Sequence, residues 1–122
     1  MKVAVTSQND SLESEIDPRF GRCSYFLIID TDTMVFDSIS NESAMSSGGA
    51  GIQAAQTIAK TGAKAVVTGN MGPNAFQTLS AAGIKVFTGA NGTIKEAIDK
   101  YKKGELKESE APNVGSHSGM VR

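Results

Sequence analysis

The chain has 122 residues, of which 39% are hydrophobic and 20% charged, as in one globular domain with a core. No apolar run approaches the ~20 residues that a membrane-spanning helix needs. Twelve Lys and Arg residues against thirteen Asp and Glu give a net charge of −1, without the basic excess of nucleic-acid-binding proteins. We therefore expect neither nucleic acid nor a membrane as a partner.

The cysteine content and the first residues bear on the compartment. Cys23 is the only cysteine, so no disulfide forms within the chain, which favours a reducing compartment. Residues 1–5 have the pattern of a strand, and no signal-peptide-like apolar stretch follows them. We predict a cytoplasmic protein and expect a monomer.

Short β-branched and apolar runs dominate the first forty residues. Runs at 2–6 and 25–30 predict buried strands, with a long polar loop over 7–22 between them. A further run at 34–40 follows the turn at 31–33, which predicts an antiparallel hairpin.

The pattern then changes to helices alternating with short buried strands. Apolar spacing predicts helices over 51–61 and from Pro73 and Thr93 onward, with strands at 65–67 and 84–87. This order predicts an α/β fold with a mixed sheet. Periodicity is lost near the end, so we expect a domain over residues 1–106 and a flexible tail over 107–122.

Three glycine-bearing loops, at 46–51, 68–73 and 88–93, each precede a predicted helix. In an open parallel α/β sheet such loops gather along one edge, where helix N-termini offer free N–H groups to an anion. None matches the nucleotide-binding P-loop. The pattern predicts an anion site at which three helix N-termini converge. The alternative is that the glycines only cap helices and form turns.

Several ordered motifs then carry a family resemblance: Asp17–Arg22 with Tyr25-Phe26, Gly48–Gly51 with Gln53–Ala55, Gly72–Phe76, Gly83–Val86 and Gly92–Ile98. Together they resemble the dinitrogenase iron–molybdenum cofactor biosynthesis family over residues 1–106. The resemblance implies a ribonuclease H-like fold. Its five-stranded mixed sheet has the order 3-2-1-4-5, with strand 2 antiparallel and three helices on its two faces.

The resemblance also implies a function. The family includes proteins that carry or insert nitrogenase cofactor precursors, and relatives that look like binders of molybdenum–copper sulfide clusters. By resemblance, this chain is a non-catalytic carrier of an anionic metal–sulfur cluster of molybdenum with iron or copper. It would act in cluster storage, delivery or assembly, with a cluster-receiving or cluster-assembling protein as partner.

Arg19 departs from the nitrogenase-associated members, which often have histidine before the Phe-Gly pair. Imidazole can ligate a metal, whereas a protonated guanidinium cannot, although its N–H groups can contact an anion. The chain therefore looks more like the relatives of the nitrogenase carriers. For Arg19 and Arg22, a role as solvent-exposed loop charges stays open.

Anionic sulfide clusters suit backbone amides flanked by small side chains. We expect the cluster to contact Arg19, Phe20, Gly21, Arg22, Ser47, Gly48, Gly49, Gly51, Asn70, Met71, Gly72, Asn74, Gly92 and Thr93. The thioethers of Met45 and Met71 either line this site or are incidental.

Two residues are candidate metal ligands. Cys23 can ligate a soft metal as a thiolate if Arg19 and Arg22 lower its pKa, but a small buried thiol is the favoured interpretation. His117, with Met120 nearby, either closes over a soft-metal site or has no role.

Two other classes of function stay open beside the carrier. One is a regulatory module acting through the hairpin or the tail. The other is an enzyme acting on a small phosphorylated ligand at the same edge, although no general base with a positioned partner is evident. A two-metal nuclease is disfavoured, because the first strand carries no carboxylate and a capping box explains Glu96.

Overall fold

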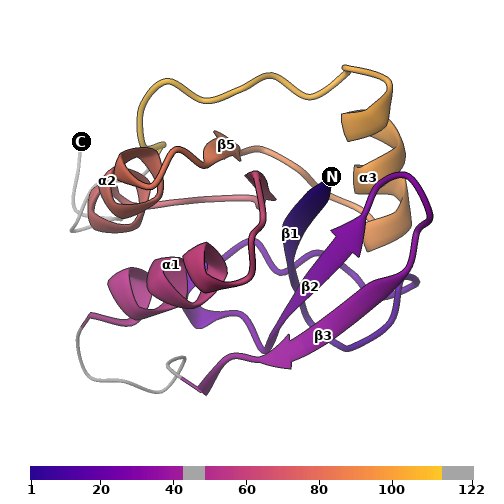
Figure 1. The fold of residues 1–122 in the computed structure, drawn as a ribbon, viewed down its shortest axis with the longest axis horizontal. Helices are drawn as coiled ribbons and strands as arrows, with labels where there is room; N and C mark the ends of the chain where they lie inside the picture. The colour runs from indigo at the N-terminus through magenta and orange to yellow at the C-terminus, as the bar shows by residue number, and fades with distance from the viewer. Residues whose placement is uncertain (43–48, 114–122) are drawn as a thin grey trace.

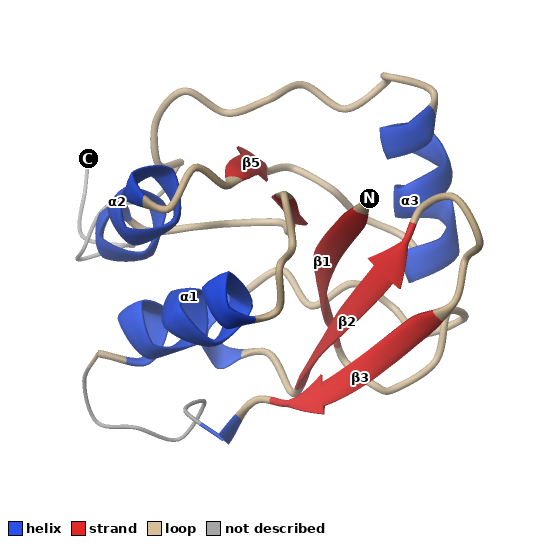
Figure 2. Cartoon of the chain, viewed as in Figure 1, coloured by secondary structure: helices blue, strands red, loops and turns tan. Residues whose placement is uncertain are grey.

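The computed structural model describes residues 1–42 and 49–113 (Figure 1). One five-stranded sheet has the order β3-β2-β1-β4-β5, as the family resemblance implied. The fold is α/β, and its ribonuclease H-like label is compatible with this order. The strands are β1 (Lys2–Ser7), β2 (Tyr25–Asp30), β3 (Phe36–Ser40), β4 (Ala65–Val67) and β5 (Lys85–Phe87) (Figure 2).

The expected antiparallel second strand is confirmed. β2 pairs antiparallel with β1, from Lys2 opposite Asp30 to Ser7 opposite Tyr25, and with β3, whereas β4 runs parallel to both β1 and β5. The hairpin turn is longer than predicted, and β3 begins at Phe36. Met34 adopts φ 64° in this turn, and its N–H donates to the carbonyl of Asp30 (2.7 Å).

Helices cover both faces of the sheet (Figure 1). The helices α1 (Ala50–Lys60) and α2 (Pro73–Ala81) share a core with Ala4 on one face. On the other face, α3 (Ile94–Lys102) shares a core with Val3 and Val5. Adjacent β1 residues serve opposite cores because strand side chains alternate between faces. Each core gains about 1.5–3 kcal/mol for every large apolar side chain that it buries.

The expected tail over 107–122 is wrong for residues 107–113. Glu108 forms an antiparallel bridge with Phe87, and the Ser109 N–H donates to the carbonyl of Val86 (2.7 Å). Further on, the Asn113 N–H donates to the carbonyl of Met71 (3.2 Å). These bonds use backbone groups at a sheet edge and a loop, so they need no hydrophobic periodicity.

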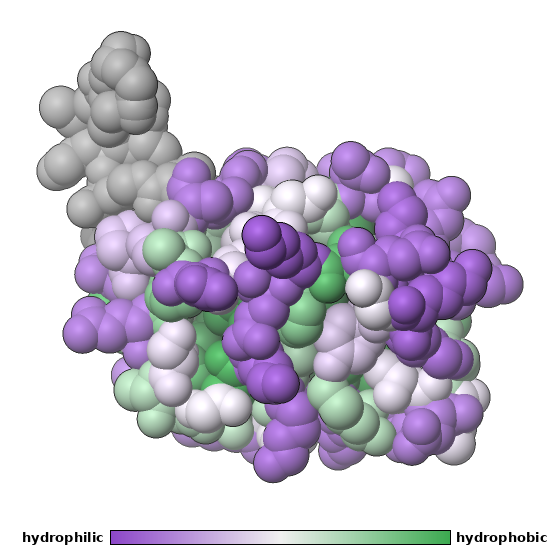
Figure 3. All heavy atoms as spheres, turned by 90° about the horizontal axis from the view of Figure 1, so that it is seen from above, coloured by the Kyte–Doolittle hydropathy of each residue, from purple (hydrophilic) through white to green (hydrophobic). Residues whose placement is uncertain are grey.

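The surface of the molecule is mostly polar in the view of Figure 3, with small apolar areas between hydrophilic side chains. Across the described ranges 1–42 and 49–113, no helix has the length and apolar character needed to cross a membrane.

The N-terminal cap of α3 gives a pH-dependent prediction. The Thr93 N–H donates to Glu96 Oε1 (2.9 Å), and this bond holds the pKa of Glu96 below its ordinary value. Because the folded pKa is depressed, the stabilising contribution is present above the ordinary pKa of Glu and is lost as pH falls through the folded value. Urea unfolding should therefore show Glu96→Gln destabilised at pH 7, with the difference shrinking below pH 4. A difference that is the same at both pH values would contradict this account.

Candidate functional site

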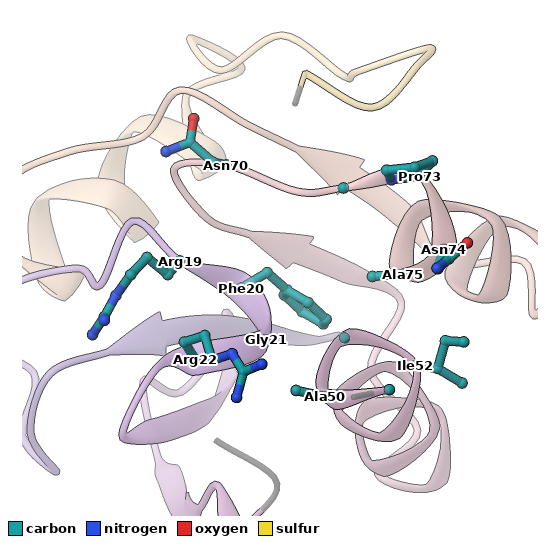
Figure 4. A pocket seen from close by; sticks show the side chains of 13 residues that line it. Arg19, Phe20, Gly21, Arg22, Ala50, Ile52, Asn70, Pro73, Asn74 and Ala75 are labelled. Carbon is teal, nitrogen blue, oxygen red and sulfur yellow. The ribbon is translucent and has the colours of Figure 1, made fainter. Parts of the chain in front are cut away.

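A pocket of about 510 Å³ lies between the short 3-10 helix η1 (Phe20–Arg22) and the N-termini of α1 and α2 (Figure 4). Three segments that are distant in sequence therefore form one site. Its lining residues are Arg19, Phe20, Gly21, Arg22, Gly49, Ala50, Gly51, Ile52, Asn70, Gly72, Pro73, Asn74 and Ala75.

Two glycines let the walls of this pocket approach each other. A Cβ atom on Gly21 would lie 3.0 Å from both the Cα and the N of Gly51, so η1 packs directly on the α1 backbone. A Cβ atom on Gly69 would lie 2.7 Å from the Cα of Pro18, where the Asn70 N–H donates to the Pro18 carbonyl (2.7 Å). These glycines are needed for packing between segments that form the site.

The first turns of α1 and α2 have no side-chain cap, and their N-cap residues are Gly49 and Gly72. The first helical bonds run from the Gln53 N–H to the Gly49 carbonyl (2.9 Å) and from the Phe76 N–H to the Gly72 carbonyl (3.1 Å). Within residues 1–42 and 49–113, the N–H groups before these donors have no protein acceptor; they belong to Ala50, Gly51, Ile52, Asn74 and Ala75. Two helix N-termini with open donors thus adjoin one pocket.

The third glycine loop does not join them. Gly92 and Thr93 are not among the lining residues, and α3 packs on the opposite face of the sheet. Its first-turn N–H groups are already bonded, from Ile94 to the Ser14 carbonyl (2.9 Å) and from Lys95 to the Leu12 carbonyl (3.0 Å). A capping box holds the Glu96 N–H. The prediction that three N-termini converge is therefore wrong, and two do.

The charges around the pocket favour an anion. Arg19 and Arg22 line it, with no acidic side chain among its lining residues. The Arg19 side chain is held by Asp17 through Nε to Oδ1 and Nη2 to Oδ2, both 3.1 Å, and this pairing raises the pKa of Arg19. Asp17 is only 2% exposed, whereas the Arg19 side chain is 64% exposed. Arg19 is thus a fixed cation at the pocket rim.

Cys23 is a buried thiol and does not line the pocket. Its Sγ donates to the carbonyl of Phe20 (3.3 Å). Burial, followed by the charge of Asp17, raises the pKa of Cys23 to about 12. The structure agrees with the favoured interpretation of a small buried thiol, and not with the alternative in which Arg19 and Arg22 lower this pKa, because burial disfavours the thiolate.

Met71 is 1% exposed and packs in the core beneath α1 and α2, so its predicted place in the site is wrong. Because Met71 lies in a glycine loop, the sequence did not indicate that it is a core residue. Among the described residues, no group of three or more His, Cys, Asp or Glu side chains can hold a metal ion. Other candidates lie outside the described residues: Met45, Ser47, Gly48, His117 and Met120.

Several residues of the site were not predicted from the sequence. Ala50, Ile52, Pro73 and Ala75 line the pocket because they occupy the first turns of α1 and α2. Their position next to the glycines in the sequence was the signal that could have identified them as lining residues. The role of Asn113 beside Asn70 had no local signal, since the two residues are 43 apart in sequence.

The family model described as "Dinitrogenase iron-molybdenum cofactor" matches residues 1–104. The apo form of the orange protein from Desulfovibrio gigas is 41% identical, with a TM-score of 0.90, over 92% of this chain and 95% of that one. A NifB-like protein from Thermotoga is 36% identical, with a TM-score of 0.77, over 88% of this chain and 91% of that one.

A curated but uncharacterised protein of Methanocaldococcus jannaschii is 30% identical over 113 residues, which cover 90% of this chain and 92% of that relative. The family match extends over η1, α1, α2 and the strands between them, and so includes each segment of the pocket. This chain therefore belongs to the dinitrogenase iron–molybdenum cofactor family.

Proposed function

We propose that this chain binds an anionic metal–sulfur cluster, of molybdenum with iron or copper, as cargo in the pocket between η1, α1 and α2. It does no bond chemistry on the cluster and serves its storage, delivery or assembly, with a second protein that supplies or receives it. The proposal places the monomeric protein in the cytoplasm, on the ground of its single cysteine.

One observation carries the proposal. The first turns of α1 and α2 have no side-chain caps and adjoin the same pocket, while α3 has its N–H groups bonded within the protein. Unpaired N–H groups and the positive ends of two helix dipoles stabilise an anion. The exposed guanidinium of Arg19 adds positive charge at the rim, partly compensated by its ion pair with Asp17.

The remaining lining suits a soft and weakly hydrated anion. Phe20, Ile52 and Pro73 provide apolar surface, and the glycines and alanines let a large group approach the backbone. The solved structure of the similar orange protein is described as its apo form, which agrees with a protein that binds a removable group. The family description names the iron–molybdenum cofactor itself.

The direct test is metal analysis. Untagged protein purified anaerobically from its native source should contain molybdenum, with iron or copper, and a visible charge-transfer spectrum. Apo protein should gain such a band from tetrathiomolybdate with copper, or from iron–sulfur donors, in the presence of excess inorganic phosphate. A colourless protein that gains no band would rule out the carrier function. Binding of phosphate in the pocket without any cluster uptake would favour the alternative, an enzyme that acts on a small phosphorylated ligand.

A bulky side chain at the start of α2 should block uptake of the cluster. Gly72 has φ −83° and ψ 174°, an extended conformation open to any residue, so Gly72→Leu should fold. Its side chain would obstruct the N–H groups of Asn74 and Ala75. Hydrogen bonds to a charged group contribute about 1.5–3 kcal/mol, so titration should show affinity reduced roughly tenfold or more.

The matched control adds the same side chain at the other end of the helix. Ala82 is an exposed C-cap residue of α2 outside the pocket, and Ala82→Leu should bind like the parent chain. Equal affinities for the two variants would show that the N-terminus of α2 is not part of the binding site.

Cys23 should not be needed for uptake. We expect Cys23→Ala to retain cluster affinity, because the thiol is buried and lies outside the pocket lining. Its pKa of about 12, raised from 9.0, also predicts that a thiol reagent at pH 8 labels the parent chain only after unfolding. Loss of uptake in a folded Cys23→Ala variant would indicate direct thiolate ligation instead.

His117 stays a predicted accessory ligand, outside the described residues. It follows Asn113 by four residues, and Asn113 lies against the 69–71 loop.

A further inference from the structure

The carrier proposal leaves the hydrogen bonds of Asn113 unexplained. This residue lies beyond the 1–104 range of the family model, yet it forms four bonds with the 69–71 loop. Its backbone N–H donates to the Met71 carbonyl (3.2 Å), and its Oδ1 accepts from the Met71 N–H (2.8 Å). Its Nδ2 donates to the Gly69 carbonyl (3.2 Å) and to Asn70 Oδ1 (3.1 Å).

The backbone partners fix the orientation of two carboxamides in turn. The Met71 N–H can only donate and the Gly69 carbonyl can only accept, so Asn113 must turn its oxygen to the first and its nitrogen to the second. The same nitrogen meets Asn70, which must therefore present its oxygen to Asn113.

The Asn70 nitrogen is consequently the part of this carboxamide that is left for a ligand at the rim. Asn70 lines the pocket and lies at its rim above Arg19 in Figure 4. In the part of the chain that the structure describes, Asn70 Nδ2 has no protein acceptor. The backbone of Asn70 is held as well, since its N–H bonds to Pro18 and its carbonyl accepts from the Phe20 N–H (3.3 Å).

We propose that Asn113 is a positioning residue for the anion pocket. It fixes the orientation of the Asn70 carboxamide, so that the N–H groups of Asn70, and not its oxygen, are available to a bound anion at the rim. This inference rests on the proposed function. Without Asn113, the Asn70 amide is free to rotate and can turn its oxygen toward an anion, so binding would have to order this side chain. The docked segment 107–113 is then part of the site.

A set of four variants tests this. Asn113→Ala removes the amide that orients Asn70, Asn70→Ala removes the donor, and the double variant removes both. Ser109→Ala is the control, since Ser109 holds the same segment through Thr88 Oγ1 (2.6 Å) without touching the 69–71 loop. Each is titrated with copper and tetrathiomolybdate, followed by charge-transfer absorption.

Asn113→Ala should weaken binding about three- to tenfold, the cost of ordering the freed Asn70 side chain on binding. Asn70→Ala should weaken it roughly tenfold or more, as for the loss of one hydrogen bond to a charged group. Ser109→Ala should stay within about twofold of the parent chain. Because Asn113 acts through Asn70, the double variant should bind no more weakly than Asn70→Ala. Unchanged affinity in Asn113→Ala, an equal loss in Ser109→Ala, or additive losses in the double variant would each overturn the inference.

If the parent chain binds no probe, the carrier proposal fails and the orientation of Asn70 is still decided by NMR. The side-chain ¹⁵N–¹H resonances of Asn70 should shift and broaden in Asn113→Ala and stay unchanged in Ser109→Ala. Identical Asn70 resonances in the parent chain and both variants would overturn the role of Asn113.

Discussion

The fate of the first-turn N–H groups of the three helices determines where this protein can hold an anion. Every helix begins with donors that its own backbone cannot satisfy. In α3 the protein supplies the acceptors, from the carbonyls of Leu12 and Ser14 and the hydroxyl of Thr93. In α1 and α2 the described residues supply none, which leaves these donors available to water or a ligand.

Close backbone packing turns two open helix ends into one pocket. Gly21 meets Gly51 with no space for a Cβ atom, so η1 is pressed against the start of α1. A Cβ atom on Gly51 would in turn lie 3.4 Å from the Cβ of Ala75, in the first turn of α2. Small residues therefore bring the two N-termini and η1 together, and the same absence of side chains leaves the N–H groups accessible. Packing and the proposed binding depend on the same residues.

The strands and helices were predictable because periodicity and helix-start signals are local. The sheet order came from the family resemblance, since pairing between β1 and β4 is a long-range choice. The glycine loop at 88–93 led to the wrong prediction that α3 contributes to the anion site, because a glycine loop does not specify which face of the sheet its helix covers. The capping box at Thr93 and Glu96 was visible in the sequence, and it already implied that one N–H group of α3 was occupied. Met71 and Asn113 depended on tertiary contacts that no local pattern encodes.

The pairing of Arg19 with Asp17 bears on which anion fits. Asp17 occupies the Nε–Nη2 edge of the guanidinium, so only the outer Nη1–Nη2 edge of Arg19 is left for a ligand. The donors left to a ligand are the outer N–H groups of Arg19, the amide of Asn70 and the backbone of two helix starts, distributed around about 510 Å³. A small anion can reach only some of these donors at once. A large anion with diffuse charge can meet them together, and its sulfide surface would also cover the apolar side chains of Phe20 and Ile52. The distribution of donors thus favours a cluster over a phosphate group.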